Sequence, residues 1–265
     1  GLFMADKTVW LITLGEVDVI AQSVAQGLRA YGLGVEGQRW PVDQAQIWMP
    51  SAQEAFQAHA SLIVVVADPV LYANPGVRRS LALFRIALET YLNRRVDGFV
   101  LPSDDSAVTE ALTGPGTLYL ADWIIPTTPT WMAKAVARVH SPSRNPLPVR
   151  IGLYAHERLG VWLEVSKEPA AECEGFLVGV SGNDAKIDFH AVGPSGKLPD
   201  RSVNEYELQG LTFDVGGLSF VAWGVQNRFG ETDSYFVRLD GEPDYLAIGH
   251  LPGGELSEVD LVRLA

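Results

Sequence analysis

The stretch ANPGVRRSLALFRIALE, residues 73–89, contains side chains whose types and spacing suit chemistry. Arg78 and Arg79 lie in the first turn of a helix predicted over Gly76 to Asn93, where the positive helix end disfavours cations. Two arginines placed there could hold a ligand phosphate or pair with an acidic neighbour. An exposed, salt-screened pair is the plainer interpretation. For Glu89, at the end of the stretch, the corresponding plain interpretation is a solvated charge on the helix surface.

Two glycine motifs superficially resemble nucleotide-binding loops. Residues 193–197, GPSGK, lack the spacing of a phosphate loop, and Leu198 stands where that loop needs Ser or Thr. A β-turn between strands is predicted there instead. Gly32-Leu33-Gly34 is not followed by a helical pattern, which excludes a dinucleotide fingerprint.

The histidines and the cysteine give no motif for catalysis or metal binding. None of the five histidines occurs at HxxxH or HExxH spacing, so no metal site is predicted. His190 alternates with Phe189 in a strand pattern, and we expect it to be half-buried or at the surface. Cys173 stands between Glu172 and Glu174, and these negative charges would raise the pKa of the thiol rather than activate it.

Composition indicates a protein with two dissimilar halves. The 265 residues are 47% hydrophobic, enough for one large or two ordinary domains. Residues 1–145 contain 11 Lys and Arg against 13 Asp and Glu, whereas residues 146–265 contain 9 against 19. The acidic second half would repel phosphate backbones, so we expect no nucleic-acid binding. No membrane-spanning run or signal pattern is found, and a single cysteine fits a reducing cytoplasm, so a cytoplasmic location is predicted.

The candidate side chains are positioned by alternating strand and helix patterns in residues 7–140, an α/β domain preceded by residues 1–6 as a cloning remnant or tail. We predict a five-stranded parallel sheet with helices on both faces. Leu14 and Gly15, at the end of the first strand, join Arg78 and Arg79 as candidate ligand-binding residues, because open α/β sheets bind ligands beyond their carboxyl ends. The predicted strands are Thr8 to Leu14, Val35 to Trp40, Ser61 to Ala67, Gly98 to Leu101 and Thr117 to Leu120.

A linker rich in proline and serine separates this domain from a different pattern. Residues 141–149 include SPSRNPLP, whose three prolines remove backbone donors and favour extended chain. Residues 150–265 show short, β-branched and aromatic-rich runs separated by turn residues at about ten-residue intervals. This predicts an acidic all-β domain, either a sandwich or a small barrel.

The order of elements in residues 7–140 resembles that of a TIR domain, of the kind found in bacterial defence proteins and innate-immune receptors. VWLITLGEVD corresponds to the first strand of that family and the acidic pair after it, here Glu16 and Asp18. LRAYGLGVEGQRW matches the helix end and second strand, SLIVVVADPVLYANP the third strand and its loop, and VDGFVLPSDD the fourth strand. The resemblance rests on order and spacing, and it says nothing of the β domain.

In catalytic members of that family, a helix glutamate cleaves the nicotinamide-ribose bond of NAD, a role that suits a carboxylate facing a developing positive charge. Aligned from Asn74-Pro75, that position falls on Ser80. Glu89 lies nine residues further along the helix, about half a turn away in direction and about 13 Å along the axis. If Phe84 is taken as the family's aromatic, Glu89 is still rotated by about 100°. The resemblance therefore implies a TIR-like domain without the catalytic glutamate.

The loop after the second predicted strand holds further candidates, for an interface. Trp40, Trp48 and Met49 occur in RWPVDQAQIWMPSA, and TIR-like domains use this loop for association. Large side chains in a loop are favoured interface anchors. Trp40 has the equally acceptable interpretation of a core residue that ends the second strand.

Together with these observations, the resemblance favours a bacterial signalling or defence protein over an enzyme. It would act by protein association, self-association or ligand sensing, with the β domain binding a partner or regulating assembly. No cofactor is required, although NAD or a related nucleotide fits as a ligand. One alternative is an active NAD glycohydrolase whose carboxylate is Glu89 or a strand-end residue such as Asp104 or Asp105. The other is a nucleotide-sensing, flavodoxin-like domain that shares only the element order.

Overall fold

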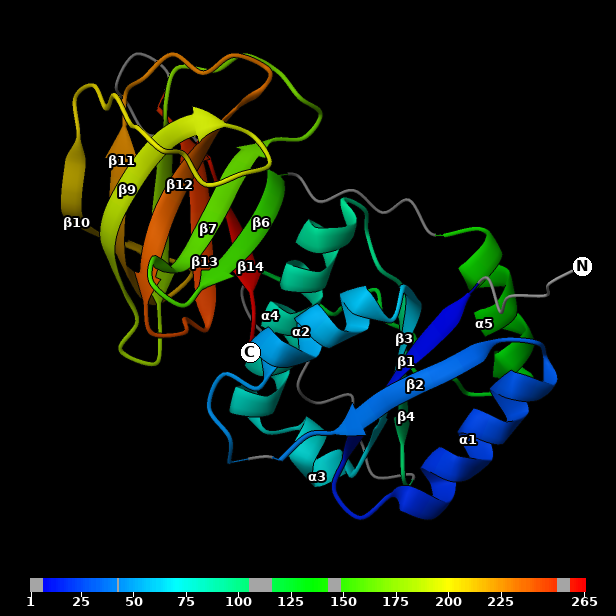
Figure 1. Cartoon of the computed structure of the whole chain (residues 1–265). Helices are drawn as coiled ribbons and strands as arrows, with labels where there is room; N and C mark the ends of the chain where they lie inside the picture. The colour runs from blue at the N-terminus through cyan, green and yellow to red at the C-terminus, as the bar shows by residue number, and fades with distance from the viewer. Residues whose placement is uncertain (1–6, 42, 105–115, 143–148, 252–257) are drawn as a thin grey trace, which may run out of the picture. The chain divides into compact units, whose positions relative to one another are not determined.

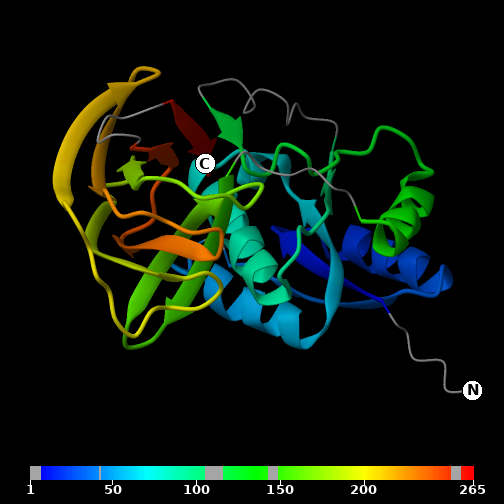
Figure 2. The same cartoon turned by 90° about the horizontal axis from the view of Figure 1, so that it is seen from above.

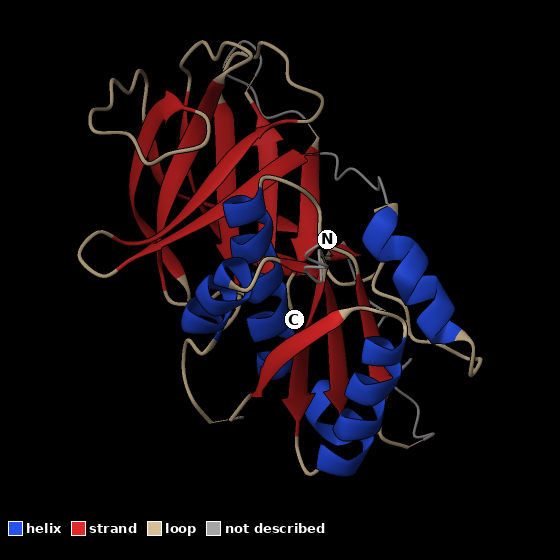
Figure 3. Cartoon of the chain, turned by 45° about the vertical axis from the view of Figure 1, so that its right-hand side comes forward, coloured by secondary structure: helices blue, strands red, loops and turns tan. Residues whose placement is uncertain are grey.

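The computed structural model describes residues 7–41, 43–104, 116–142, 149–251 and 258–265. The chain divides into two compact units, residues 1–113 with 120–145 and residues 114–119 with 146–265. All helices in the described ranges belong to the first unit (Figure 3). None of them combines the length and the apolar character that crossing a membrane requires.

The first unit is a parallel sheet with helices on both faces (Figure 1). Its strand order is β2-β1-β3-β4, so β1 and β3 are central and the connections are crossovers. The strands are β1 (Thr8–Leu14), β2 (Gly34–Arg39), β3 (Ala60–Ala67) and β4 (Gly98–Pro102). The helices are α1 (Asp18–Ala30), α2 (Trp48–Gln57), α3 (Pro69–Tyr72), α4 (Pro75–Leu92) and α5 (Trp131–His140).

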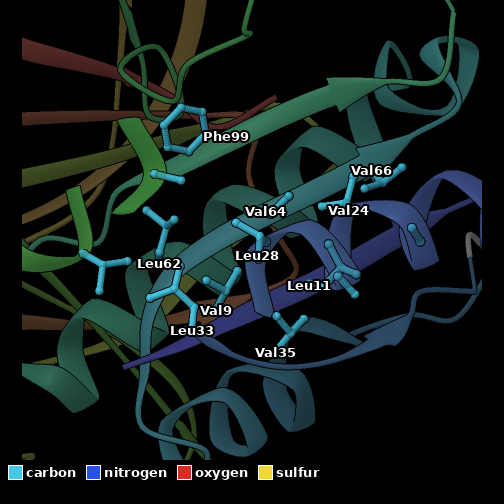
Figure 4. Packing of buried hydrophobic residues seen from close by; sticks show 14 of the residues in the cluster. Val9, Leu11, Val24, Leu28, Leu33, Val35, Leu62, Val64, Val66 and Phe99 are labelled. Carbon is cyan, nitrogen blue, oxygen red and sulfur yellow. The ribbon is translucent and has the colours of Figure 1, made fainter. Parts of the chain in front are cut away.

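One face of this sheet is covered by α1 and α5. Alternate strand residues such as Val9, Leu11 and Val64 pack against the stripe of α1 that contains Val24 and Leu28 (Figure 4). The alternation follows from the two-residue period of a strand, and the helical stripe from spacings of three and four. On the other face, α2 packs along α4.

The prediction that Thr117 to Leu120 form the fifth strand of this sheet is wrong. Residues Thr117–Leu118 form β5, which pairs in parallel with β14 (Val259–Arg263) of the second unit. Beside β4, a single bridge between Phe99 and Ile124 takes the fifth place, with Val100 N–H donating to Ile124 O at 2.9 Å. Gly98 permits this approach, because a Cβ there would lie 2.6 Å from the Trp123 ring. The apolar run at Thr117 correctly indicates a strand, but periodicity carries no information about its partner.

The second unit consists of two sheets packed face to face. Trp223 in one sheet meets His190 in the other, and Phe229 lies between Phe176 and Tyr235, so the two sheets share one core. This is a sandwich, one of the two predicted architectures. The strands are β6 (Val149–His156), β7 (Gly160–Lys167), β12 (Asp233–Asp240) and β9 (Lys186–Pro194) in one sheet, and β10 (Leu208–Val215), β11 (Leu218–Val225), β8 (Phe176–Ser181), β13 (Tyr245–His250), β14 and β5 in the other.

Candidate functional site

The carboxyl edge of the parallel sheet brings the ends of β1 and β3 together. Asp68 N–H, just after β3, donates to Leu14 O at 2.9 Å. Gly15 follows with φ +89°, and a Cβ built there would lie 3.0 Å from Leu71 Cδ1 and 3.1 Å from Asp68 Cβ. Only glycine adopts this conformation without strain and leaves the backbone approachable. The two residues predicted from the end of the first strand therefore lie where an open α/β sheet accommodates a ligand.

Two capping residues shape the chain after β3. Asp68 Oδ1 accepts from Val70 N–H at 2.9 Å and begins α3, and Asn74 Oδ1 accepts from Gly76 N–H at 2.8 Å and begins α4. A proline occupies the first turn of each helix, where a missing N–H is tolerated. These local signals fix the start of α4 at the carboxyl edge.

Arg78 and Arg79 both lie near that start, but not as exposed charges. Arg78 is only 4% exposed, and Arg79 is half-buried. Burial raises the pKa of Tyr72 to about 12, an effect that the nearby positive charge of Arg78 partly opposes. The interpretation of a solvent-screened pair is therefore wrong for Arg78. Its charge is held within the packed layer between α3 and α4.

The position of the expected catalytic glutamate is Ser80, which is half-buried on α4. Glu89 is the only acidic residue of that helix. The strand-end alternative involves Asp104, which is exposed two residues after β4, whereas Asp105 lies outside the described residues. No carboxylate of α4 stands near its amino end.

Glu89 is instead buried at the opposite edge of the sheet. Its Oε2 accepts from Val96 N–H at 2.8 Å, just before β4 begins, and its Oε1 lies 3.1 Å from Arg95 Nη1. Arg85, one turn earlier, approaches Oε2 at 3.6 Å. The interpretation of a solvated surface charge is wrong, and so is any role for Glu89 at the carboxyl edge. The spacing of Arg85 and Glu89 at i,i+4 was the available sequence signal.

Asp122 completes this buried ion network. It binds Arg85 through two contacts, 2.5 Å to Nη1 and 2.9 Å to Nη2, and Arg85 also lies over the Trp123 ring, 5.3 Å from its centroid. Burial acts to raise the pKa of Asp122, but the hydrogen bond and charge of Arg85, together with the charge of Arg95, lower it overall. The network ties α4 to the residues that precede the bridge at Ile124.

The exposed edge residues Asp18 and Arg39 form a second, weaker pair. Arg39 Nη2 lies 2.5 Å from Asp18 Oδ2, and both side chains are more than half exposed. Solvent screens such a pair strongly. It links the end of β2 to the first turn of α1.

The predicted interface residues are mostly interior. Trp40 is buried edge-on against Phe84, with ring centroids 5.6 Å apart, and its Nε1 donates to Ser51 Oγ at 3.1 Å. This supports the core interpretation of Trp40. Trp48 is fully buried at the first position of α2. Met49 is half-exposed, and it is the only one of the three whose side chain is accessible to solvent to that extent.

A shallow cavity of about 570 Å³ lies along β2 and α2 rather than at the carboxyl edge. Glu36 and Glu54 line it, so its charge disfavours the phosphate groups of a nucleotide. The lining is completed by Trp10, Gly37, Gln57 and Ala58.

The second unit contains a buried polar centre that the sequence did not reveal. His190 is 2% exposed, not at the surface as expected, and its ring nitrogens lie 2.7 Å from Tyr235 Oη and 2.9 Å from Glu207 Oε1. A carboxylate only accepts, so Nε2 carries the proton toward Glu207 and Nδ1 accepts from Tyr235. Asn204 also donates to Glu207, at 2.8 Å. His190 and Tyr235 lie on the neighbouring strands β9 and β12 of one sheet, whereas Glu207 directly precedes β10 of the other sheet, so the contact between His190 and Glu207 is the one that links the two sheets. Because Tyr235 is fully buried, the arrangement presents no reactive hydroxyl.

The GPSGK segment forms the predicted turn, not a phosphate site. Gly196 has φ +94° and its N–H donates to Glu164 Oε2 at 3.0 Å. Glu164 is 2% exposed and also accepts from Tyr154 at 2.8 Å. A buried carboxylate facing the turn disfavours phosphate.

Cys173 and the histidines remain without a catalytic arrangement. The pKa of the Cys173 thiol is raised as predicted, but burial rather than its glutamate neighbours is the cause. In the part of the chain that the structure describes, no three His, Cys, Asp or Glu side chains are grouped as metal ligands.

No protein-family model matches this chain, and no curated protein resembles it closely enough to count as a relative. The functional argument therefore rests on the fold and on the geometry of the carboxyl edge.

Proposed function

We propose that this chain is a bacterial signalling or defence protein whose first unit is a degenerate TIR-like domain. It acts by protein association or by sensing a ligand, not by cleaving NAD. The β sandwich binds a partner or regulates assembly. The β2-β1-β3-β4 order of a parallel sheet with helices on both faces supports the TIR-like assignment.

The proposal that the chain does not cleave NAD rests on the position of Glu89. The only carboxylate of α4 accepts from Val96 N–H and pairs with Arg95 at the amino edge of the sheet. NAD cleavage requires a carboxylate beside the anomeric carbon. At the carboxyl edge, α4 supplies Ser80, and a hydroxyl cannot balance a developing positive charge as an anion does. The residues of α4 therefore do not fit the catalytic role.

The carboxyl edge still suits ligand sensing. Gly15 leaves the backbone after β1 approachable, and the half-buried Arg79 places a cation in the first turns of α4, next to the buried Arg78. NAD or a related nucleotide has the phosphates that such cations attract. Binding without turnover would make this edge a sensor.

An NAD assay tests this proposal. We expect the purified chain to release no nicotinamide from NAD, measured by chromatography against an active TIR enzyme as the positive control. Turnover that disappears in Asp104→Asn would overturn the proposal in favour of an NAD glycohydrolase using a strand-end carboxylate. Turnover lost in Glu89→Gln, with the fold retained, would place the chemistry at the amino edge.

Ligand sensing is tested by calorimetric titration with NAD and with ADP-ribose. Gly15→Ala should abolish binding, because the added Cβ crowds Leu71 and Asp68 and closes the approach to the backbone. Gly32→Ala is the matched control, since Gly32 has nearly the same φ, +88°, but nothing within 4 Å of the added Cβ. Equal binding by both variants would show that the carboxyl edge is not the ligand site.

A further inference from the structure

Among the residues that the structure describes, the six-stranded sheet of the second unit ends in an edge strand that has no strand partner on its outer side. β10 is the terminal strand of the order β10-β11-β8-β13-β14-β5, and Figure 2 shows the β10–β11 hairpin, in yellow and orange, at that end. A two-residue Gly216-Gly217 turn, with both φ positive, closes the hairpin. An edge strand presents a row of N–H and C=O groups that can pair with another chain.

The sequence of β10 lacks the features that usually protect such an edge. LQGLTFDV has one charged residue, Asp214, and neither proline nor lysine. Its register irregularity is confined to the start, between Leu208 and Leu211, and residues 211–215 pair regularly with β11. At the opposite end of the sheet, the last strand has only two residues. The long, regular and nearly uncharged edge is therefore β10.

Apolar side chains of β10 are only partly covered. Phe213 stacks on the buried Phe220 with ring centroids 5.5 Å apart, and together with Leu208 it packs against the cluster around Leu177. Leu211, two residues before Phe213 and on the same face, is 43% exposed. A further strand beside β10 would extend this face and cover both Leu211 and Phe213.

We propose that β10 pairs with β10 of a second copy of this chain, antiparallel and about a two-fold axis at Thr212. The two-residue turn makes Val215 and Leu218 a hydrogen-bonded pair, and the alternation along the ladder turns the backbone groups of Thr212 and Asp214 away from β11. In the register centred on Thr212, outward-facing residues meet outward-facing residues. The two six-stranded sheets then become one continuous sheet.

The side chains favour this register and a second copy as the occupant. Thr212 lies opposite Thr212 of the other copy, Leu211 opposite Phe213, and Asp214 opposite Gly210, all combinations without charge conflict. A register centred on Asp214 would oppose two carboxylates and is disfavoured. The same strand satisfies both sides of a two-fold contact, as an isologous interface requires.

The experiment measures the oligomeric state of the full chain by sedimentation velocity over a wide range of concentration. We expect a concentration-dependent dimer that Leu211→Lys weakens by about tenfold or more, because a charge replaces a buried apolar contact. Thr212→Pro removes an outward N–H and should also give a monomer. Val221→Lys is the matched control on β11, since Val221 is 38% exposed but lies one strand inside the edge. Far-UV circular dichroism verifies that each variant is folded.

A wild-type chain that stays monomeric at all concentrations overturns the proposal, and so does a dimer that Leu211→Lys and Val221→Lys affect equally. Register is tested separately in a Cys173→Ser background. Oxidation of Thr212→Cys should yield a disulfide-linked dimer, whereas Val221→Cys should not. A dimer that cross-links equally through both cysteines would contradict pairing at β10. None of these results depends on ligand binding by the first unit, so the proposal stands or falls independently of the sensing function.

Discussion

Each unit of this protein buries a polar centre, and the two centres are built from different chemistry. In the first unit, Arg85 joins Glu89 and Asp122 in a network of permanent charges. In the second, His190 joins Tyr235 and Glu207, and its charge depends on pH. Arginine stays protonated at any physiological pH, whereas histidine titrates near neutrality. We therefore expect the stability of the arginine centre to depend on the presence of its charged partners. The stability of the histidine centre should depend both on its partners and on pH.

The largest expected effect is loss of the arginine at the centre of the first network. Arg85→Met leaves the buried Glu89 and the half-buried Asp122 with less compensating charge, and should reduce the free energy of unfolding by about 3–5 kcal/mol. Urea denaturation measures this loss. Arg39→Met is the matched control, because the exposed pair with Asp18 contributes only about 0–1 kcal/mol. Equal losses in the two variants would show that burial of the network has no energetic role.

A smaller effect is expected at the second centre. His190→Phe keeps a ring against Trp223 but leaves the buried Tyr235 hydroxyl without its acceptor, at a cost of about 1–3 kcal/mol. Adding Tyr235→Phe removes that hydroxyl as well. The double variant should therefore lose less than the sum of the single variants. Additive losses would mean that the Tyr235 contact does not stabilise the sandwich.

The smallest and most specific effect is the pH dependence of stability. Burial lowers the pKa of His190 below its usual value, although the hydrogen bond to Glu207 opposes this shift. The unfolded chain therefore binds more protons, and stability should fall as pH decreases through the usual histidine pKa of about 6.5. The pKa of Glu207 is also lowered, chiefly by hydrogen bonds from Asn204 and His190, which adds a loss in the same direction at lower pH.

The physical reason for the histidine effect lies in the hydrogen-bond directions. In the neutral ring, Nδ1 accepts from Tyr235, but a protonated ring would present two donors and the phenol would have to reverse its role. Urea denaturation from pH 7.5 to pH 5 should show a decline that is shallower in His190→Phe. His250 must be replaced in a parallel variant, because burial lowers its pKa too. If stability declines equally in His190→Phe and in the unmodified chain, groups other than His190 cause the pH dependence.

The sequence supports the strands and helices better than it supports their partners. The runs from Thr8 to Leu14 and from Ser61 to Ala67 are apolar enough to indicate buried strands, and the helix predicted over Gly76 to Asn93 agrees with α4 to within one residue at each end. Side-chain contacts between residues that are far apart in the chain could not be predicted from the sequence. Asp122 lies 37 residues from Arg85, and Tyr235 lies 45 residues from His190. A single sequence without its relatives contains no signal that links such positions.

The same limit explains why some side chains that were predicted to be exposed are buried. Trp48 follows a loop-like stretch, and nothing in its neighbours shows that a helix begins there and turns the indole inward. The position of Leu14 and Gly15 at the carboxyl edge, by contrast, could be predicted. In an open α/β sheet, ligands approach the connection from a central parallel strand to the next helix.

The short strand β5 has a consequence for how this protein can be divided. Residues 114–119 belong to the second unit although residues on both sides of them belong to the first. The chain thus passes from one unit to the other three times, and the proline-rich segment at residues 141–149 is only the last of these passages. A cut there leaves the second unit incomplete, because the amino-terminal fragment retains a strand of the sandwich. Recombination at a single point in the gene therefore cannot transfer the complete second unit as an independent module.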